Sequence, residues 1–446
     1  MYSDKIINYF QKIASHKSSK LLVIFAIQGV SAILGLTVQF LLARQMDVEE
    51  YGRFNILFNA VGIFTMIVSL GSSNYILRQI SIYHPQNHSK TVNEFNHGLS
   101  YLTINWLVLT ILCFGIHYFF LQKTEYSFSL SLVIMVAFWV LFGAYSQFLQ
   151  NFDRATGNPI RSMLPTTVFK SCLLIASILI FMYYGLRITA QESILFYLFS
   201  LISVALLFSI FEYRYIDVKE SIKKPFSNYK KSFVESYQYF INKISQNLLK
   251  NLDLIFVGIY LTDYDAGVYG AATRINLIVI FGLRSLSILY SPMVAKLFKQ
   301  KQIKKLNQSI KKPNLIIFLF SGFLFLIIIV LGEFLLDIFG KNYISGYWVL
   351  LLLSARNLVD AFFGITGSVL NMSGNQKFFN KILYFLLGAY IILSPFAIGY
   401  GNLTGLALLV LLIAIVKNII QWRFIYFNLG IHSGLFSNLY YKIVSK

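Results

Sequence analysis

The feature that most constrains this chain is a series of apolar runs, each about twenty residues long, that recurs from one end of the sequence to the other. A run of that length is what a helix needs to cross the hydrocarbon layer of a membrane. The chain has 446 residues, of which 57% are hydrophobic and 13% charged, which is more apolar surface than a soluble core of this length can bury. The sequence therefore predicts an all-α, polytopic membrane protein.

We expect about twelve transmembrane helices. The weakest boundary is the last one, because the stretch from Ile382 to Val416 has no charged residue and only the Gly-Tyr-Gly-Asn segment at 399–402 indicates a turn. Eleven helices is the alternative. The predicted spans lie near residues 21–43, 54–77, 99–121, 126–149, 162–185, 193–211, 236–261, 268–295, 314–332, 347–371, 379–399 and 402–422.

The formal net charge of +20 would indicate nucleic-acid binding in a soluble protein. Here the lysines and arginines gather in alternate connections between the predicted spans, as they do in cytoplasmic loops of membrane proteins. The densest stretch, Lys296–Lys312, is best explained by this rule, with contact to lipid headgroups as the alternative. We therefore expect a multi-pass protein of the bacterial cytoplasmic (inner) membrane with both termini in the cytoplasm, and no nucleic acid as partner.

Two motifs repeat at long range, which indicates internal duplication. Asp47–Gly52 (DVEEYG) returns as Asp265–Gly270 (DAGVYG), at an offset of 218 residues. Thr156–Asn158 (TGN) returns as Ser373–Asn375 (SGN), at an offset of 217 residues. The agreement between the two offsets predicts two related halves of six helices each.

We expect the halves to be an N-terminal six-helix bundle, residues 1–216, and a C-terminal six-helix bundle, residues 217–446. A repeat with an even number of spans leaves both copies facing the same way, so a pseudo-two-fold axis along the membrane normal should relate them. Two such bundles with a hydrated cavity between them would suit transport by alternating access.

Several segments resemble the signature of polysaccharide flippases, the polysaccharide transporter family of the multidrug/oligosaccharidyl-lipid/polysaccharide (MOP) exporter superfamily. They are Leu42–Arg44, Glu49–Phe54, Leu70–Gly71 and Leu77–Arg78 in the first half, and Asp253–Ile255, Gly258, Gly267–Ala272 and Ser291–Pro292 in the second. The resemblance extends over nearly the whole chain, and the length and helix number agree with that family.

The resemblance implies a transporter and not an enzyme. Its cargo would be an undecaprenyl-diphosphate-linked oligosaccharide, such as an O-antigen unit of lipopolysaccharide, a capsule unit or an exopolysaccharide unit, moved from the cytoplasmic to the periplasmic leaflet. A proton or sodium gradient would drive the movement, and no cofactor is implied. A polysaccharide polymerase and a chain-length regulator are the expected protein partners, and we expect a monomer surrounded by membrane lipids.

Charged residues inside the predicted spans are candidates for the transport site, because each costs roughly 2.5 to 3.5 kcal/mol at the centre of a membrane helix. The predicted substrate-binding residues are Arg284, Lys250 and Arg356, with Gln28 and Gln246 as polar residues at equivalent positions of the two halves. Gln246 and Lys250 lie on the seventh predicted span, where they form a polar stripe with Lys243 and Asp253 at steps of three and four residues. This stripe should line the cavity. The alternative is that such groups only bind neighbouring helices together.

Arg284 is predicted to lie near mid-bilayer, where its guanidinium could bind a diphosphate through two parallel hydrogen bonds. The alternative is a salt bridge to Asp253 or Asp360 across the bundle. Four other basic residues lie near predicted span ends, where long side chains can reach the headgroups. These are Lys170, Lys243, Lys417 and Arg274.

Asp360 and Asp253 are the predicted ion-coupling residues, because they are the two carboxylates inside the predicted spans. Asp360 follows Arg356 by four residues, so both share one helix face. The alternative is a permanent Arg356–Asp360 ion pair that never changes its charge, because an adjacent cation favours the ionised carboxylate. Asp253 beside Lys250 has the same two interpretations.

Two other functions compete with a flippase. A multidrug (MATE-like) cation antiporter of the same superfamily should have a cavity rich in carboxylates, whereas bases outnumber acids in these spans. A membrane polysaccharide polymerase or ligase should carry a large catalytic loop, whereas the longest predicted periplasmic connection, Gly332–Gly346, is short. Cys113 and Cys172 fall in different apolar runs, so neither a disulfide nor a metal site is expected.

Overall fold

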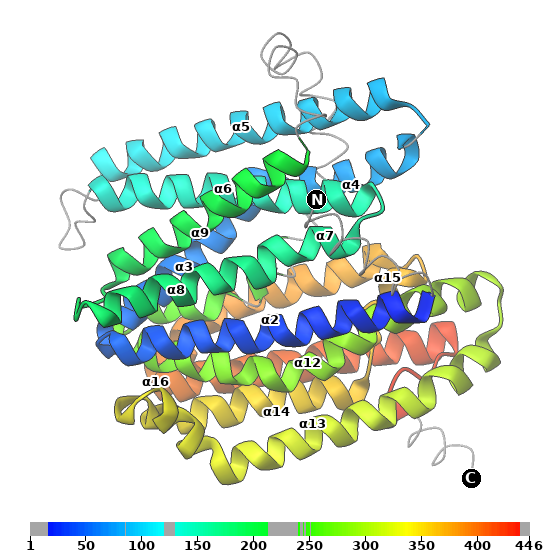
Figure 1. Ribbon diagram of the computed structural model, residues 1–446. Coiled ribbons are helices and arrows are strands. Elements are labelled where there is room, and N and C mark those ends of the chain that lie inside the picture. The colour runs from blue at the N-terminus through cyan, green and yellow to red at the C-terminus, as the bar shows by residue number, and fades with distance from the viewer. Residues whose placement is uncertain are drawn as a thin grey trace. The chain divides into compact units, whose positions relative to one another are not determined.

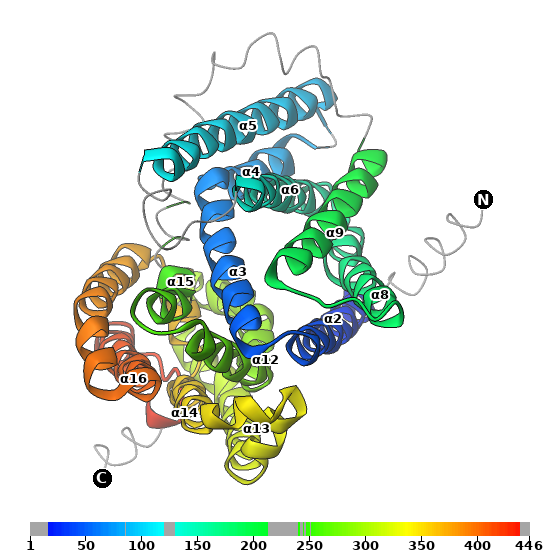
Figure 2. The same ribbon diagram turned by 90° about the vertical axis from the view of Figure 1, so that its left-hand side faces the viewer.

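The computed structural model describes residues 17–84, 86–119, 130–212, 240, 244, 247–249 and 251–437, and all their regular structure is helical (Figure 1). The chain divides into two compact units, Met1–Gln45 with Leu57–Ile244, and Met46–Ile56 with Ser245–Lys446. Within each unit the long helices run side by side, as the view along them shows (Figure 2). The fold is the predicted all-α arrangement of two helical bundles.

The first unit is built around α6. This helix packs against α4, α5 and α9, while α8 packs against α2 and α9. The elements are α2 (Lys17–Gln45), most of α3 (Val48–Ser69), α4 (Ser72–Tyr83), α5 (His88–Phe119), α6 (Leu130–Ala155), α7 (Pro159–Leu164), the π-helix η2 (Pro165–Phe169), α8 (Lys170–Tyr183) and α9 (Ala190–Phe211).

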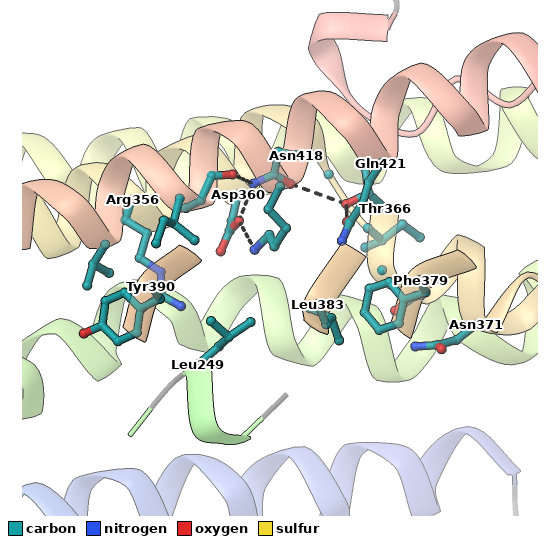
Figure 3. Close-up of a pocket in the computed structure, with 18 residues that line it drawn as sticks. Leu249, Arg356, Asp360, Thr366, Asn371, Phe379, Leu383, Tyr390, Asn418 and Gln421 are labelled. Carbon is teal, nitrogen blue, oxygen red and sulfur yellow. Dashed lines mark hydrogen bonds and ion pairs between the residues drawn. The ribbon is translucent and has the colours of Figure 1, made fainter. Parts of the chain in front are cut away.

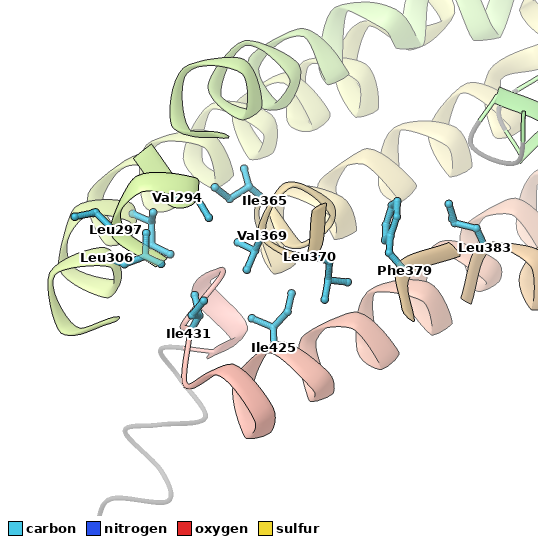
Figure 4. Packing of buried hydrophobic residues seen from close by; sticks show 11 residues of the cluster. Val294, Leu297, Leu306, Ile365, Val369, Leu370, Phe379, Leu383, Ile425 and Ile431 are labelled. Atoms are coloured by element: carbon cyan, nitrogen blue, oxygen red, sulfur yellow. The ribbon is translucent and has the colours of Figure 1, made fainter. Parts of the chain in front are cut away.

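The second unit is built around α14, which packs against α12, α13 and α16. One end of this unit is closed by a cluster of buried aliphatic side chains that includes Val369, Leu370 and Ile425 (Figure 4). The elements are the helix Asn251–Tyr260, α12 (Asp263–Lys299), α13 (Ile303–Phe339), the 3₁₀-helix η4 (Lys341–Gly346), α14 (Tyr347–Phe363), α15 (Thr366–Met372) and α16 (Gln376–Leu429).

Nine helices among the described residues are long and apolar enough to cross a membrane. Large apolar side chains on them are exposed rather than packed inside, for example Ile111 at 68%, Val330 at 77% and Phe396 at 62%. Such surfaces are stable in lipid and not in water. The chain is therefore a multi-pass membrane protein.

Local sequence signals begin and end several helices. Thr189 and Glu192 form a capping box at the start of α9, and Thr262 and Asp265 form one at the start of α12. Each box satisfies backbone N–H groups that have no partner inside the helix. Gly430 ends α16 in the left-handed conformation, which glycine adopts without steric cost.

The structure corrects the boundaries of two predicted spans. The span predicted near 54–77 is two helices, because Leu70 and Gly71 have positive φ values of 37° and 79° and separate α3 from α4. The span predicted near 347–371 breaks at Gly364, whose φ of 75° ends α14 before α15 begins. The second break lies in apolar sequence, whereas the first precedes Ser72, Ser73 and Asn74, polar residues that the predicted span includes in one helix.

The two last predicted spans form one helix, α16, with an interruption. Asn402 has φ 48° and ψ −134° and interrupts the helical backbone there. This position lies in the Gly-Tyr-Gly-Asn segment that the sequence singles out as the only turn signal between those spans. α16 thus supplies the eleventh and twelfth spans as a bent pair without a long connecting loop.

The internal duplication has a structural counterpart in the turn of each unit that precedes α7 or α16. Gly157 and Gly374 have φ values of 87° and 80°. The following asparagine N–H groups donate to the carbonyl oxygens five residues back, Asn158 to Asp153 at 2.9 Å and Asn375 to Leu370 at 3.1 Å. The two copies therefore form the same helix-ending turn.

The other repeated motif brings two helix starts into close contact within the second unit. A Cβ atom at Gly52, near the start of α3, would overlap the carbonyl oxygen of Asp263 at the start of α12, and one at Gly267 would overlap the carbonyl oxygen of Val48. Arg53 Nε donates to Asp263 Oδ2 at 2.7 Å across the same contact. Residues Met46–Ile56 therefore pack with the second unit, whereas the predicted boundary at 216/217 lies outside the described residues.

We predict that Gly52→Ala lowers the free energy of unfolding by about 2 kcal/mol or more, because the methyl group meets backbone atoms that have no side-chain freedom to move. Thermal unfolding in detergent measures the effect. The matched control is Gly388→Ala in α16, where nothing lies within 4 Å of the added Cβ. Equal melting temperatures for the two variants would contradict the close approach of α3 and α12.

Candidate functional site

A cavity of about 360 Å³ lies in the second unit between α14, α15 and the two halves of α16 (Figure 3). Polar side chains form a row along its lining. In Figure 3, Tyr390 and Arg356 lie at one end, Asp360 and Asn418 in the middle, and Gln421, Thr366 and Asn371 toward the other end. This chamber belongs to one unit, whereas the sequence analysis expected the transport cavity between the bundles.

The break between α14 and α15 shapes this cavity. The N–H of Gly364 donates to the carbonyl oxygen of Asp360 at 3.0 Å and ends α14 one turn after that carboxylate. A Cβ atom at Gly364 would overlap the carbonyl oxygen of Ser433, which also accepts a hydrogen bond from Asn314 Nδ2 at 2.7 Å. The side chain of Asp360 is thereby held at the end of a helix that cannot continue.

A neighbouring face of α14 is held by amide hydrogen bonds to α12. Asn357 Nδ2 donates to Asn276 Oδ1 at 2.8 Å, and Ser354 Oγ donates to the same oxygen at 3.2 Å. Because residues 354 and 357 lie on one helix face, 356 and 360 are turned toward α16. These bonds determine which side chains of α14 face the cavity.

Asp360 is paired with Lys417 of α16. Lys417 Nζ lies 2.9 Å from Asp360 Oδ1, and Asn418 Nδ2 donates to the same oxygen at 2.6 Å. The side chains of Lys417 and Asp360 are 22% and 13% exposed. Lys417, which the sequence pattern places at a span end, thus neutralises the candidate coupling carboxylate, and Arg356 is not its ion-pair partner.

Arg356 lines the cavity without a hydrogen bond or ion pair among the described residues. Its guanidinium lies near Tyr390 in Figure 3, and its charge acts on both Asp253 and Asp360. With Lys417 and Asp360 cancelling each other, the described part of the lining has one excess positive charge, from Arg356. A guanidinium with free donors in a recessed site favours a ligand that offers paired anionic oxygens.

Two further polar atoms lining the cavity have no hydrogen-bond partner among the described residues. They are the hydroxyl of Tyr390 and Nε2 of Gln421, on side chains of residues that are 2% and 1% exposed. The other amide atom of Gln421, Oε1, accepts from Thr366 Oγ1 at 2.9 Å, which fixes the orientation of the amide. Buried polar atoms are seldom left unpaired, so these atoms are positions where a ligand or water would bind.

Asp253 occupies a separate position in the same unit. It is 5% exposed and accepts a hydrogen bond from the hydroxyl of Tyr269 at 3.1 Å. Tyr269 belongs to the repeated motif at the start of α12. Asp253 is not part of the cavity lining, so the structure does not bring the two candidate coupling carboxylates together in it.

The remaining predicted site residues are only partly described. Gln28 lies on α2 in the first unit and is half-buried. Arg284 lies on α12, but its side chain is outside the described part of the structure, and Lys250 and Gln246 are outside it altogether. Of the predicted site, Arg356 and Asp360 are therefore brought together, and Tyr390, Lys417, Asn418 and Gln421 are added. Lys417, Asn418 and Gln421 share a helix face in the last predicted span, a signal that the sequence carried.

Comparison with family models identifies the family of this chain. Residues 19–298 match the model described as "Polysaccharide biosynthesis protein", which is more than half of the chain. The chain belongs to this family. Residues 239–400, which include Arg356 and Asp360, also match the MatE model. No curated protein matches the chain.

Solved structures of the MOP superfamily share the fold of this family member. An inward-facing multidrug resistance MATE family transporter superposes with a TM-score of 0.72 at 16% identity, covering 92% of this chain and 98% of that one. The lipid II flippase MurJ, in an inward closed conformation, gives 0.68 at 14% identity, covering 92% and 87%. A MOP transporter from Pyrococcus furiosus, described as having a binding pocket of reverse polarity, gives 0.60 at 15% identity, covering 92% and 94%. The chain therefore shares the fold of these transporters and of this flippase.

We predict that Lys417→Met lowers the free energy of unfolding by about 2 to 3 kcal/mol, because it leaves Asp360 charged and unpaired in a largely buried site. The double variant Lys417→Met with Asp360→Asn should recover most of that loss, since neither member of the pair then leaves its partner as an unpaired charge. Melting temperatures in detergent provide the measurement, with Lys377→Met at the exposed start of α16 as control. A double variant no more stable than Lys417→Met would show that the ion pair does not hold α14 to α16.

Proposed function

We propose that this protein is a flippase for an undecaprenyl-diphosphate-linked oligosaccharide, such as an O-antigen, capsule or exopolysaccharide unit. Movement would proceed from the cytoplasmic to the periplasmic leaflet of the bacterial cytoplasmic membrane. Membership of the polysaccharide biosynthesis family supports this cargo, as does the shared fold with a lipid II flippase. The observation that carries the proposal is the guanidinium of Arg356, which has no hydrogen bond or ion pair among the described residues and lies in a cavity whose other described charges cancel.

The chemistry of the cavity fits a diphosphate with attached sugars. Arg356 can bind two phosphate oxygens in parallel, and the hydroxyl of Tyr390 is a donor beside it. The neutral groups Thr366, Asn371 and Gln421 at the other end suit sugar hydroxyls, which both donate and accept hydrogen bonds. The polar lining therefore changes from a charged end to an amide and hydroxyl end, as a lipid-linked sugar does.

Lys417 gives this cavity a way to couple cargo to an ion. A bound diphosphate would compete with Asp360 for the Lys417 ammonium, which lies 2.9 Å from the carboxylate. Once Lys417 turns to the phosphate, Asp360 loses its counter-charge and gains affinity for a proton or sodium ion. In this proposal Asp360 remains the coupling residue, and Asp253 has a supporting role through Tyr269.

A MATE-like cation antiporter is the second candidate. The observation in its favour is that Asp360 already holds an ammonium group, so it could hold the cationic group of a drug instead. The MatE model also covers this part of the chain. Against it stands Arg356, which would repel a cationic cargo in the same cavity.

We predict that Arg356→Gln reduces delivery of lipid-linked repeat units to the periplasmic leaflet by about tenfold or more, the loss expected for one charge-assisted bidentate contact. Arg356→Lys should give an intermediate rate, since an ammonium keeps the charge and loses the paired geometry. The control is Arg423→Gln, an exposed arginine on α16. Surface glycan and the sidedness of lipid-linked intermediates are measured in cells that carry each variant at equal protein level.

Depletion of the protein distinguishes the competing functions. Complete repeat units that accumulate on the cytoplasmic side support a flippase. Unpolymerised units already on the outer side would indicate a polymerase instead. Unchanged glycan with increased drug sensitivity would favour cation export, and normal glycan in Arg356→Gln would remove this residue from the site.

A further inference from the structure

Three charged residues meet in the first unit, at the corner where α6 ends, α7 begins and α9 ends. Arg161 of α7 contacts the carboxylates of Asp153, in the last turn of α6, and of Glu212, the residue that caps α9. Arg161 Nε lies 2.9 Å from Asp153 Oδ1, and its Nη2 contacts both Asp153 Oδ1 and Glu212 Oε1. One guanidinium nitrogen therefore holds two carboxyl groups next to each other.

The two carboxyl groups are almost completely buried, at 0% for Asp153 and 1% for Glu212. One oxygen of each, Asp153 Oδ2 and Glu212 Oε2, has no hydrogen-bond partner among the described residues. Two ionised carboxylates and one guanidinium would leave a buried net charge of −1, which is costly. One added proton would make the corner neutral and would supply a donor for the unpaired oxygens.

The second unit shows that this corner of the fold does not require charges. The offset of 217 residues that relates the two helix-ending turns carries Asp153, Arg161 and Glu212 onto Leu370, Phe378 and Leu429. Leu370 belongs to the aliphatic cluster of Figure 4, and Phe378 and Leu429 pack against that cluster. The same turn is therefore stabilised by apolar contacts in one copy and by a charged triad in the other, so packing alone does not explain the triad.

From this geometry we infer that Asp153 and Glu212 share one exchangeable proton beside Arg161, and that this corner is a proton-binding site of the first unit. In the protonated state the Glu212 O–H donates to the Asp153 carboxylate, and the net charge of the triad is zero. Release of the proton leaves two carboxylates on one guanidinium and a net charge of −1. The inference does not depend on the identity of the cargo.

The surrounding groups indicate that Glu212 is the group that holds the proton. Burial, and next the adjacent carboxylate of Asp153, raise the pKa of Glu212 to about 8, against the opposing effect of Arg161. Arg154 on α6 is exposed, and Lys170 at the start of α8 does not act on Glu212. η2 carries no charged residue. The only other acid on α9, Glu192, is bound to Thr189 at the far end of that helix.

Release of this proton would change the contacts between α6, α7 and α9. Like charges on adjacent carboxylates repel, and one guanidinium cannot neutralise both. The corner would therefore be held firmly below the pKa of Glu212 and loosely above it. A proton gradient across the membrane could act on the first unit at this point.

Infrared difference spectroscopy of the full-length protein in detergent tests the inference directly. Wild type should show the carbonyl stretch of a protonated carboxylic acid that disappears as the pH rises through about 8. That band should be missing from Glu212→Gln and present in the control Glu333→Gln, an exposed acid at the end of α13. In Asp153→Asn the band should titrate at lower pH, because the neighbouring negative charge is gone. A wild-type spectrum that matches that of Glu212→Gln throughout the titration overturns the inference.

The pH dependence of stability provides a second readout. A folded-state pKa of about 8, against the ordinary value of 4.5, means that the folded protein binds more protons than the unfolded chain between these values. Stability from this group is therefore complete below about pH 4.5 and is lost as the pH rises to about 8. Glutamine mimics the protonated acid, so Glu212→Gln should match wild type at about pH 4, gain an increasing advantage in melting temperature between about pH 4.5 and 8, and keep that advantage at about pH 9. If the melting temperatures of wild type and Glu212→Gln run parallel as the pH changes, with Glu212→Gln lower at every pH, Glu212 has a structural role only and the proton site is contradicted.

Discussion

A charge placed among membrane helices has to be balanced by another charge, by a hydrogen bond or by water, because hydrocarbon provides none of these. In the second unit this requirement joins α14 to α16 through Asp360 and Lys417, with Asn418 donating to the same carboxylate. Arg356, on the same face of α14, is left with no partner among the described residues. The proposed function assigns this group to the cargo.

The same requirement applies in the first unit, where acidic groups outnumber the basic group in a buried cluster. There one arginine faces two carboxylates, and the further partner that we infer is a proton. The corresponding corner of the second unit has three apolar residues and needs no counter-ion. The two units therefore differ in local chemistry, with an excess cation among the described residues of the cavity in the second unit and an excess acid in the Asp153–Arg161–Glu212 cluster of the first.

This division fits transport driven by a proton gradient. In the proposals above, the second unit recognises the anionic headgroup and the first unit senses protons, so the two events need not use the same carboxylate. Asp360 and Glu212 differ in the way their charges are balanced. Asp360 has a cation of its own and would be freed only by the cargo, whereas Glu212 competes with Asp153 for one guanidinium and responds to pH.

The helical architecture follows from local sequence, because in lipid every helix must satisfy its own backbone hydrogen bonds and therefore shows its length as an apolar run. Most of the spans, the repeated turn at Gly157 and Gly374, and the interruption of α16 near Asn402 were predicted from local sequence. Most of the N-terminal half of the span predicted near 236–261 lies outside the described residues. The breaks at Gly71 and Gly364 were missed. A single glycine in apolar sequence, as at Gly364, is compatible with a continuing helix, and the Ser-Ser-Asn stretch after Gly71 was too short to separate two spans by length alone.

The partners of the charged side chains could not be predicted from the sequence. Lys417 lies 57 residues from Asp360, and Glu212 lies 51 residues from Arg161. Each pair depends on which helix packs against which, and on the helix face that neighbouring contacts such as Asn276–Asn357 leave free. Spacing along one helix predicted Arg356 as the neighbour of Asp360, because that distance alone can be calculated from sequence. Where chemistry depends on which charge meets which, the answer lies in the packing between helices.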